Sequence, residues 1–238
     1  MESSSADFFA EGALWYLVFL FSTVLHEAAH ALAAHKLGDS TAYEGGQVTL
    51  NPIPHIRREP FGTLVVPTLT YALGGWMMGW ASAPYNLAWA ILYPRRAAWM
   101  SLAGPAANFL LMAFAALAVR TGILVGAFAP PDQINFTHIV SAVGAGGTVY
   151  VATFVSILFS LNLLLCLFNL LPVPPLDGSG VIPLFLAEDP ARRYLAYIRR
   201  QPMLVFGGMY LAWKFFGYLY SPLHLLAINL LYPEMHFR

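Results

Sequence analysis

Residues 14–37 read LWYLVFLFSTVLHEAAHALAAHKL, and this stretch largely determines the fold class. About 20 predominantly apolar residues are enough for a helix to cross the hydrocarbon core of a bilayer. Three ionisable residues nevertheless lie within five consecutive positions of the stretch: His26, Glu27 and His30. Such groups are costly inside a membrane and are functional by default. We therefore expect a membrane-spanning helix that carries a functional site.

The three ionisable residues form the motif H-E-x-x-H over residues 26–30. Residues four apart share one face of a helix, so the two imidazoles can reach a single zinc ion. Glu27 is then placed to take a proton from the attacking water. The alternative is an ordinary polar patch in a helix bundle, which the cost of three ionisable groups in an apolar span disfavours.

A catalytic zinc ion usually has three protein ligands and one open position. The strongest third candidate is Asp177, which follows the proline-rich segment 172–175, where the helix must break. The alternative role for this carboxylate is to cap a helix over 178–187. Cys166 and His35 are weaker candidates, because the first is typical of a small buried residue and the second adjoins the end of its helix.

The composition excludes several classes of protein. Of the 238 residues, 58% are hydrophobic and only 10% are charged, whereas soluble domains are about 45–50% apolar and about 25% charged. Twelve basic and twelve acidic residues cancel, so no net field favours binding to nucleic acid. A single cysteine excludes a disulfide framework within the chain. A soluble enzyme, a disordered chain and a nucleic-acid binder are thus all disfavoured.

We predict an all-α polytopic membrane protein with about four to six transmembrane helices. One intramembrane domain is expected over 1–238, with a catalytic core over about 14–188. Residues 1–12 contain no Lys or Arg, so the first apolar run is expected to be a retained helix and not a signal peptide. The candidate membrane segments are 14–37, 61–80, 97–119, 149–171 and 203–231, the last with a bend near Pro222.

The distribution of Lys and Arg favours a re-entrant segment 61–80, which enters the membrane and returns to the same side. If every segment crossed, the two sides would carry nearly equal numbers of basic residues. If 61–80 is re-entrant, nine basic residues share the cytoplasmic side and only Arg120 and Arg238 lie opposite, as the positive-inside rule requires. The nine are Lys36, Arg57, Arg58, Arg95, Arg96, Arg192, Arg193, Arg199 and Arg200.

Residues 45–50, Gly-Gly-Gln-Val-Thr-Leu, are typical of a turn and a short strand. We expect a short β-hairpin there, close to the active site. Its edge could pair with an unwound substrate by strand addition. The alternative is a simple connecting hairpin.

Residues 169–178, NLLPVPPLDG, match the N-x-x-P-x-P-x-L-D-G motif of the site-2 protease family at every fixed position. The upstream H-E-x-x-H also resembles that family. Between the two motifs, 101–108 (SLAGPAAN) is similar to its A-G-P and G-x-x-x-N segment, and 49–52 with His55 is similar to a signature of its small bacterial branch. The resemblance covers roughly residues 14–188.

The resemblance implies an intramembrane zinc metalloprotease that hydrolyses peptide bonds in or near transmembrane segments of membrane proteins. It implies one zinc ion held by His26, His30 and Asp177, and it suggests that Asn169 and Asn108 bind substrate. The alternative roles for these two asparagines are to satisfy backbone carbonyls and to pack beside Gly104. Near His55 the chain departs from the family pattern, so we expect a structural or interfacial role there.

The resemblance also implies a multi-pass protein of the bacterial cytoplasmic membrane. We find no segment long enough for a PDZ or nucleotide-sensing domain, so regulation is expected to depend on a membrane partner or a homo-oligomer. Two other functions stay open. One is an inactive zinc-binding membrane scaffold, which would not need Glu27. The other is a zinc transporter, which should show an internal repeat that is not visible here.

Overall fold

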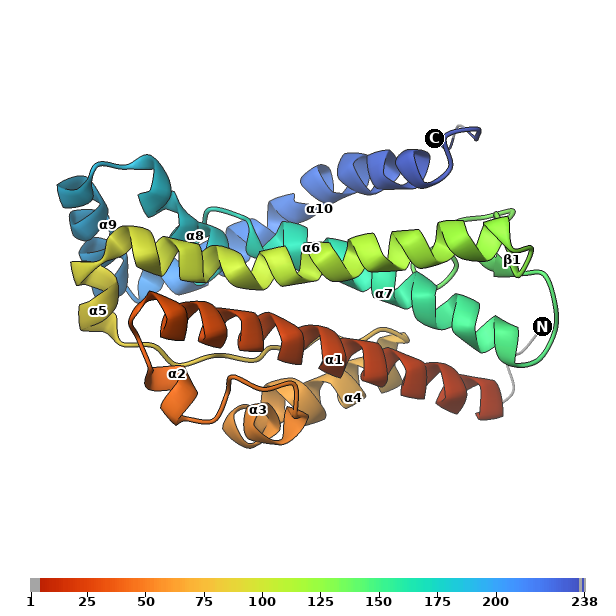
Figure 1. Ribbon diagram of the computed structural model, residues 1–238, viewed down its shortest axis with the longest axis horizontal. Helices are drawn as coiled ribbons and strands as arrows, with labels where there is room; N and C mark the ends of the chain where they lie inside the picture. Colours follow the sequence, from red (N-terminus) through yellow and green to blue (C-terminus); the bar gives the residue numbers. More distant parts are fainter. Residues whose placement is uncertain (1–4, 236, 238) are drawn as a thin grey trace.

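The computed structural model describes residues 5–235 and residue 237. Its elements are almost all helical, which confirms the predicted all-α class (Figure 1). They are α1 Ser5–Leu37, α2 Thr41–Glu44, α3 Pro52–Arg58, the π-helical turn η1 Phe61–Val65, α4 Val66–Gly74, α5 Leu87–Leu92, α6 Pro94–Leu124, β1 Phe128–Ala129, β2 Ser141–Ala142, α7 Gly147–Asn169, α8 Asp177–Val181, the 3-10 turn η2 Ile182–Phe185, α9 Glu188–Arg200 and α10 Met203–Leu231.

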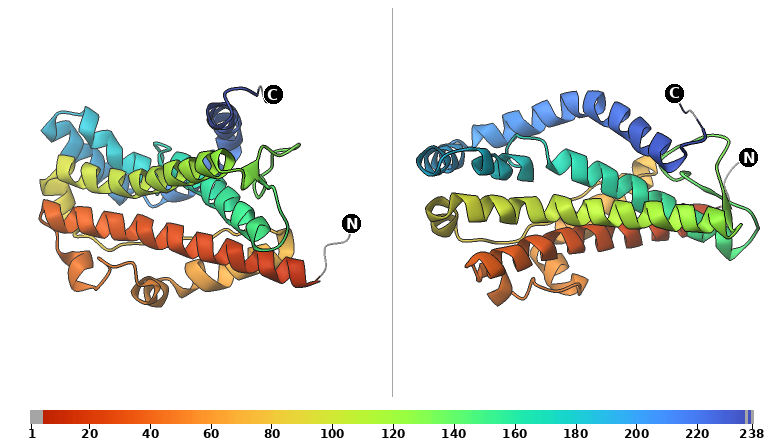
Figure 2. Two further views of the ribbon diagram at one scale, coloured as in Figure 1. Left: turned by 45° about the vertical axis from the view of Figure 1, so that its right-hand side comes forward. Right: turned by 45° about the horizontal axis from the view of Figure 1, so that its top comes forward.

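Three helices, α1, α6 and α7, are long and apolar enough to cross a membrane. They pack side by side in Figures 1 and 2. Helix α7 is the central one, since 61% of its most apolar window is buried, against 33% for α1 and 28% for α6. Many large apolar side chains of α1 and α6 remain exposed, which suits contact with lipid. These features indicate a membrane protein.

Helix α10 spans the predicted residues 203–231 and contains Pro222. It changes direction along its length, as predicted (Figure 2). Its hydropathy falls below the level that marks the other three helices as candidate spans. A fourth crossing by α10 therefore stays a prediction. Helix α6 is continuous through Gly104 and Pro105, so that pair does not interrupt it.

Segment 61–80 turns back on itself. Its helical part ends at Gly74, and Gly75 follows with a φ of +72°, the left-handed conformation that ends many helices. The N–H of Trp80 then donates to the carbonyl of Gly62 at 3.1 Å. The fourteen residues of η1 and α4 would rise only about 21 Å at 1.5 Å per residue, less than a hydrocarbon core of about 30 Å. The segment thus forms a hairpin, which is the shape that the predicted re-entrant path requires, and the path through a membrane stays a prediction.

The predicted β-hairpin at 45–50 is wrong. These residues form a turn and bends without a strand, and the side chain of Asn51 then caps α3 by accepting from the N–H of Ile53 at 3.0 Å. Within the described residues the two-stranded sheet pairs β1 with β2. It lies at the end of α6 away from α8 (Figure 1). Residues 77–86 form a drawn-out segment without regular secondary structure (Figure 1), and residues 81–85 line a cavity together with α8.

Candidate metal centre

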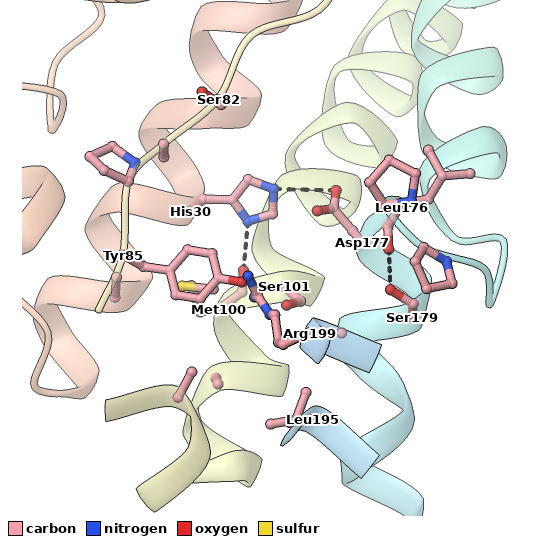
Figure 3. Close-up of a pocket in the computed structure, with 18 of the residues that line it drawn as sticks. His30, Ser82, Tyr85, Met100, Ser101, Leu176, Asp177, Ser179, Leu195 and Arg199 are labelled. Atoms are coloured by element: carbon pink, nitrogen blue, oxygen red, sulfur yellow. Dashed lines mark hydrogen bonds and ion pairs between the residues drawn. The ribbon is translucent and has the colours of Figure 1, made fainter. Parts of the chain in front are cut away.

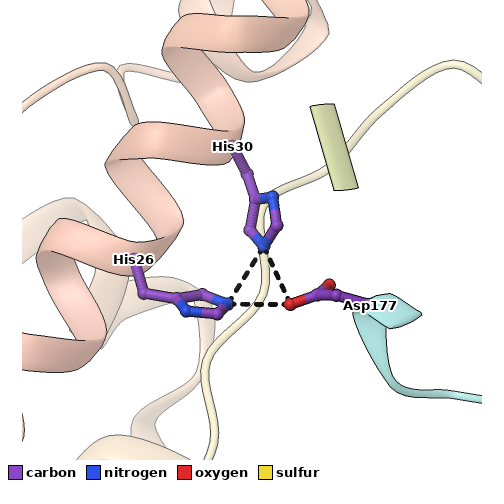
Figure 4. Close-up of side chains that lie close together, drawn as sticks. All are labelled: His26, His30 and Asp177. Carbon is purple, nitrogen blue, oxygen red and sulfur yellow. Dashed lines mark hydrogen bonds and ion pairs between the residues drawn. The ribbon is translucent and has the colours of Figure 1, made fainter. Parts of the chain in front are cut away.

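Two helices and a loop bring His26, His30 and Asp177 together (Figure 4). Both histidines project from one face of α1, as their spacing predicts. Asp177 begins α8, just after the prolines that end α7. Nε2 of His26 lies 3.0 Å from Nε2 of His30, and Oδ2 of Asp177 lies 3.1 Å from the first and 3.3 Å from the second. Among the described residues this is the one group of three such side chains that could hold a metal ion.

The alternative role of Asp177 as a helix cap is not what the structure has. Leu176 occupies the N-cap position of α8, and no side chain caps the helix. The carboxylate points toward the two histidines (Figure 4). The other two candidate ligands lie elsewhere. Cys166 is buried within α7, and His35 hydrogen bonds to Ser40 and stacks on Tyr43.

In each histidine, Nδ1 faces away from the metal group and hydrogen bonds to an oxygen atom. Nδ1 of His30 lies 2.7 Å from the backbone carbonyl of Met100, which can only accept, so this nitrogen carries the proton. Nδ1 of His26 lies 2.6 Å from Oδ1 of Asn108. Metal-bound histidines almost always have such a partner on their second nitrogen, because it fixes the tautomer and the ring orientation.

A chain of fully buried side chains fixes the orientation of Asn108. Asn162 donates from Nδ2 to the carbonyl of Leu158 at 2.8 Å and to Ser22 at 2.9 Å. Its oxygen therefore faces Asn108, which donates to it at 2.8 Å. The oxygen of Asn108 must then accept from Nδ1 of His26. In the neutral imidazole, the lone pair of His26 then lies on Nε2.

Three electron-pair donors consequently face one point: two imidazole nitrogens and one carboxylate oxygen. With both rings neutral, these three donors would repel one another unless a cation lay between them. Two histidines and a carboxylate are also a common ligand set of catalytic zinc. Gly104 makes room for them, because a Cβ at this position would overlap Nε2 of both histidines. The residues present therefore fit a zinc ion.

The predicted base, Glu27, lines a cavity of about 550 Å³ together with His30 and Asp177 of the metal group. Figure 3 shows this cavity around His30 and Asp177. It is 7% exposed and makes no hydrogen bond with another described residue. The cavity lies between α1, α6, α8, α9 and the extended segment 81–85. Its volume is within the range of about 300–1,000 Å³ that is usual for ligand sites.

The two candidate substrate-binding asparagines differ in position. Asn108 is fully buried behind His26 and does not line the cavity, so the predicted contact with substrate is replaced by a role in orienting His26. Asn169 is partly buried at the end of α7 and donates to the carbonyl of Leu165 at 3.0 Å. The carbonyl of Leu165 is not one of those that lose their N–H partner to Pro172 or Pro174. The alternative role of Asn169, to satisfy such carbonyls, therefore does not explain this hydrogen bond.

Ser22 and Asn162 were not anticipated from the sequence. Both are polar residues in the middle of apolar spans, and that signal alone could have identified them. His55 is 2% exposed, and its Nε2 donates to the carbonyl of Thr49 at 3.1 Å. It thus stabilises the loop before α3 and lies outside the metal group.

Comparison with known proteins gives relatives of one kind. The chain is 38% identical over 171 residues to “Putative zinc metalloprotease YwhC” of Bacillus subtilis, with 70% of this chain and 67% of the relative covered. It is 33% identical over 173 residues to “Putative zinc metalloprotease Rip2” of Mycolicibacterium smegmatis, covering 73% of this chain and 57% of that relative. For Rip2 of Mycobacterium tuberculosis Erdman the identity is 30% over 207 residues, covering 84% and 69%.

No family model matches the chain, and no solved structure matches it. The relatives nevertheless cover most of its length. They are members of one family, whose metal is zinc. By this similarity and by the geometry of His26, His30 and Asp177, the chain belongs to the site-2 protease family of zinc metalloproteases.

Proposed function

We propose that this protein is an intramembrane protease that hydrolyses peptide bonds in or near transmembrane segments of membrane-protein substrates. The observation that carries the proposal is the position of Glu27 and the metal group. Glu27, His26 and His30 lie on an apolar helix long enough to cross a bilayer. Glu27, His30 and Asp177 line the cavity of about 550 Å³. A soluble protease would have no need to build its site into such a helix.

In this proposal His26, His30 and Asp177 hold one zinc ion. When bound, the ion supplies Lewis acidity, which lowers the pKa of a water molecule and polarises the scissile carbonyl. The carboxylate of Glu27 takes the proton from the attacking water and delivers it to the leaving amine. Because Glu27 makes no hydrogen bond to a described residue, its oxygens are available for this transfer.

The substrate would lie along residues 81–85, the extended wall of the cavity. Within the described chain, the backbone of this segment makes no backbone hydrogen bond. A helical substrate hides its own amides, so it must unwind before hydrolysis. An unwound peptide could satisfy its amides by pairing with 81–85. Asn169, which keeps one amide proton and its oxygen free, remains a candidate for substrate binding.

The proposal includes a multi-pass position in a bacterial cytoplasmic membrane. Helices α1, α6, α7 and α10 would cross, and 61–80 would be re-entrant from the cytoplasmic side. The basic residues of α9 support a cytoplasmic position for that helix. Regulation by a membrane partner or by homo-oligomerisation is part of the same proposal.

The experiment reconstitutes the purified protein in lipid vesicles with single-span model substrates and maps cleavage by mass spectrometry. We expect cleavage within or next to the span, lost on chelation and restored by zinc. Cleavage of soluble peptides alone would contradict an intramembrane role. Zinc movement across the vesicles without any cleavage would favour a transporter, and neither activity would favour a scaffold.

A further inference from the structure

Arg199 is the one Lys or Arg among the described residues that line the cavity of the metal group. It projects from the last turn of α9, and Figure 3 shows its side chain extending toward Tyr85. Its guanidinium carbon lies 4.8 Å from the centre of the Tyr85 ring. The side chain of Arg199 keeps substantial solvent exposure, so it lies where the cavity opens to solvent.

No carboxylate in the described part of the chain pairs with Arg199. The described ion pairs involve the metal group and Arg192, which pairs with Glu188 one turn earlier on α9. On helix α9, Arg192 therefore has a carboxylate partner that supports the helix, whereas Arg199 has no carboxylate partner among the described residues. The guanidinium lies over the face of the Tyr85 ring, and its N–H groups donate to no other described residue.

The charges that line the cavity are thus separated. Judged by burial, the buried Glu27 and the partly buried Asp177 mark the inner end of the cavity, and the exposed Arg199 marks its outer end. Glu27 and Asp177 offer a substrate carboxylate no positive charge of their own. The same carboxylate would find a planar donor fork at the outer end, the geometry that recognises carboxylates best.

We infer that Arg199 is a specificity residue that binds an acidic side chain of the substrate close to the scissile bond. This inference rests on the proposed protease function, whose substrate it makes more specific. Tyr85 is the positioning residue that holds the guanidinium against the cavity wall. An Asp or Glu on the α9 side of the scissile bond would be favoured over Asn, Gln or Lys.

The experiment uses quenched fluorescent peptides in detergent, in which Asp, Asn or Lys is placed in turn at each position around one cleavage site. With the zinc-loaded protein we expect kcat/KM for one Asp position to exceed that for Asn by about 10-fold or more, as for hydrogen bonds between charged groups. Arg199→Gln should bring this ratio close to one, Arg199→Glu should favour Lys, and Arg199→Lys should retain part of the preference for Asp. The matched control is Arg200→Glu, the next residue of α9, which does not line the cavity and should keep the wild-type ratio.

A second measurement separates this inference from the proposed function. Affinities of the same peptides are measured on the non-cleaving Glu27→Gln protein, with and without Arg199→Gln. If the wild type cleaves neutral peptides in a zinc-dependent way without preferring Asp, the inference fails and the protease function stands. If no peptide is cleaved, the proposed protease function fails. The ratio of the affinities for the Asp and Asn peptides, measured with and without Arg199→Gln, still decides whether Arg199 binds an acidic side chain. An Arg199→Gln effect that is equal for all peptides and appears only in anionic lipid would assign the residue to a lipid headgroup and overturn the inference.

Discussion

Ser82 donates a hydrogen bond of 2.6 Å to the carboxylate of Glu59, although 23 residues separate them. Ser82 in turn accepts from Nε of Arg58 at 3.2 Å. The two ends of the hairpin that contains α4 are therefore joined. Since one end lies next to the other, the proposed re-entrant path would place both at the same depth and on the same side of the membrane.

This relationship predicts the outcome of cysteine labelling. In a Cys166→Ser background, Arg57→Cys and Ala88→Cys should both be protected from a membrane-impermeant maleimide in intact cells and react after permeabilisation. Val125→Cys, just beyond the other end of α6, should react in intact cells. All three positions are exposed in the structure. Opposite behaviour of Arg57→Cys and Ala88→Cys would show that the segment crosses, and the re-entrant account would be abandoned.

The hydrogen bonds that link His26, Asn108 and Asn162 predict that Asn108 controls zinc affinity. Asn108→Leu removes the acceptor for Nδ1 of His26, and loss of such a partner typically weakens metal binding by about 10- to 100-fold. The control is Asn169→Leu, because Asn169 takes no part in these hydrogen bonds and its loss should leave zinc affinity unchanged. Competition with a fluorescent chelator measures both. Equal affinities in the two variants would remove Asn108 from the metal site.

Gly104 predicts a steric route to the same loss. A Cβ at this position would overlap Nε2 of His26 and His30, so Gly104→Ala should purify with far less than one zinc per chain. Gly147→Ala is the matched control, because a Cβ there meets nothing within 4 Å. Elemental analysis of both proteins checks the expectation. Full zinc occupancy in Gly104→Ala would mean that the two helices can separate without cost.

Asp39 predicts a dependence of stability on pH. Burial tends to raise the pKa of Asp39, but hydrogen bonds from Thr41 and from the backbone of Asn86 outweigh it and hold this pKa below its ordinary value. The ionised form is thus favoured by folding. Its contribution is complete above the unfolded pKa of about 3.9, and it is lost as the pH falls through the lower folded value.

Asp39→Asn should therefore melt at a lower temperature than the wild type at pH 7, and the gap should close on acidification. Measuring the difference between the two proteins cancels the titration of other carboxylates. A gap that stays constant down to pH 3 would show that the ionised form of Asp39 does not contribute. Because Asp39 joins the end of α1 to the start of α5, the variant should also loosen segment 81–85.

The sequence allowed the helices and the metal group to be predicted, because both depend on local patterns. Apolar length gives the spans, and residue spacing on α1 places two ligands on one face. The expected strand at 45–50 failed because its turn residues lead directly into α3, where Asn51 forms a cap. The extended segment 77–86 has no periodic pattern. Long-range contacts with Asp39 and Gly62 hold it in place.

The same limit applies to the cavity. Asn108 and Asn162 are recognisable as polar residues in apolar spans, but their connection to His26 depends on how three helices pack. Arg199 counts in the sequence only as one of nine basic residues on one side of the membrane. Its place in the cavity follows from the return of α9 toward α5 and α6, a tertiary arrangement that no local pattern encodes.

The most direct test of the central claim measures zinc content and proteolysis on the same preparation of Glu27→Gln. This change keeps size and hydrogen bonding but removes basicity, and Glu27 is not one of the three candidate ligands. We predict about one zinc per chain, as in the wild type, together with a fall in cleavage rate of about 10²- to 10⁴-fold. Zinc retained with cleavage near the wild-type rate would contradict the assignment of Glu27 as the base.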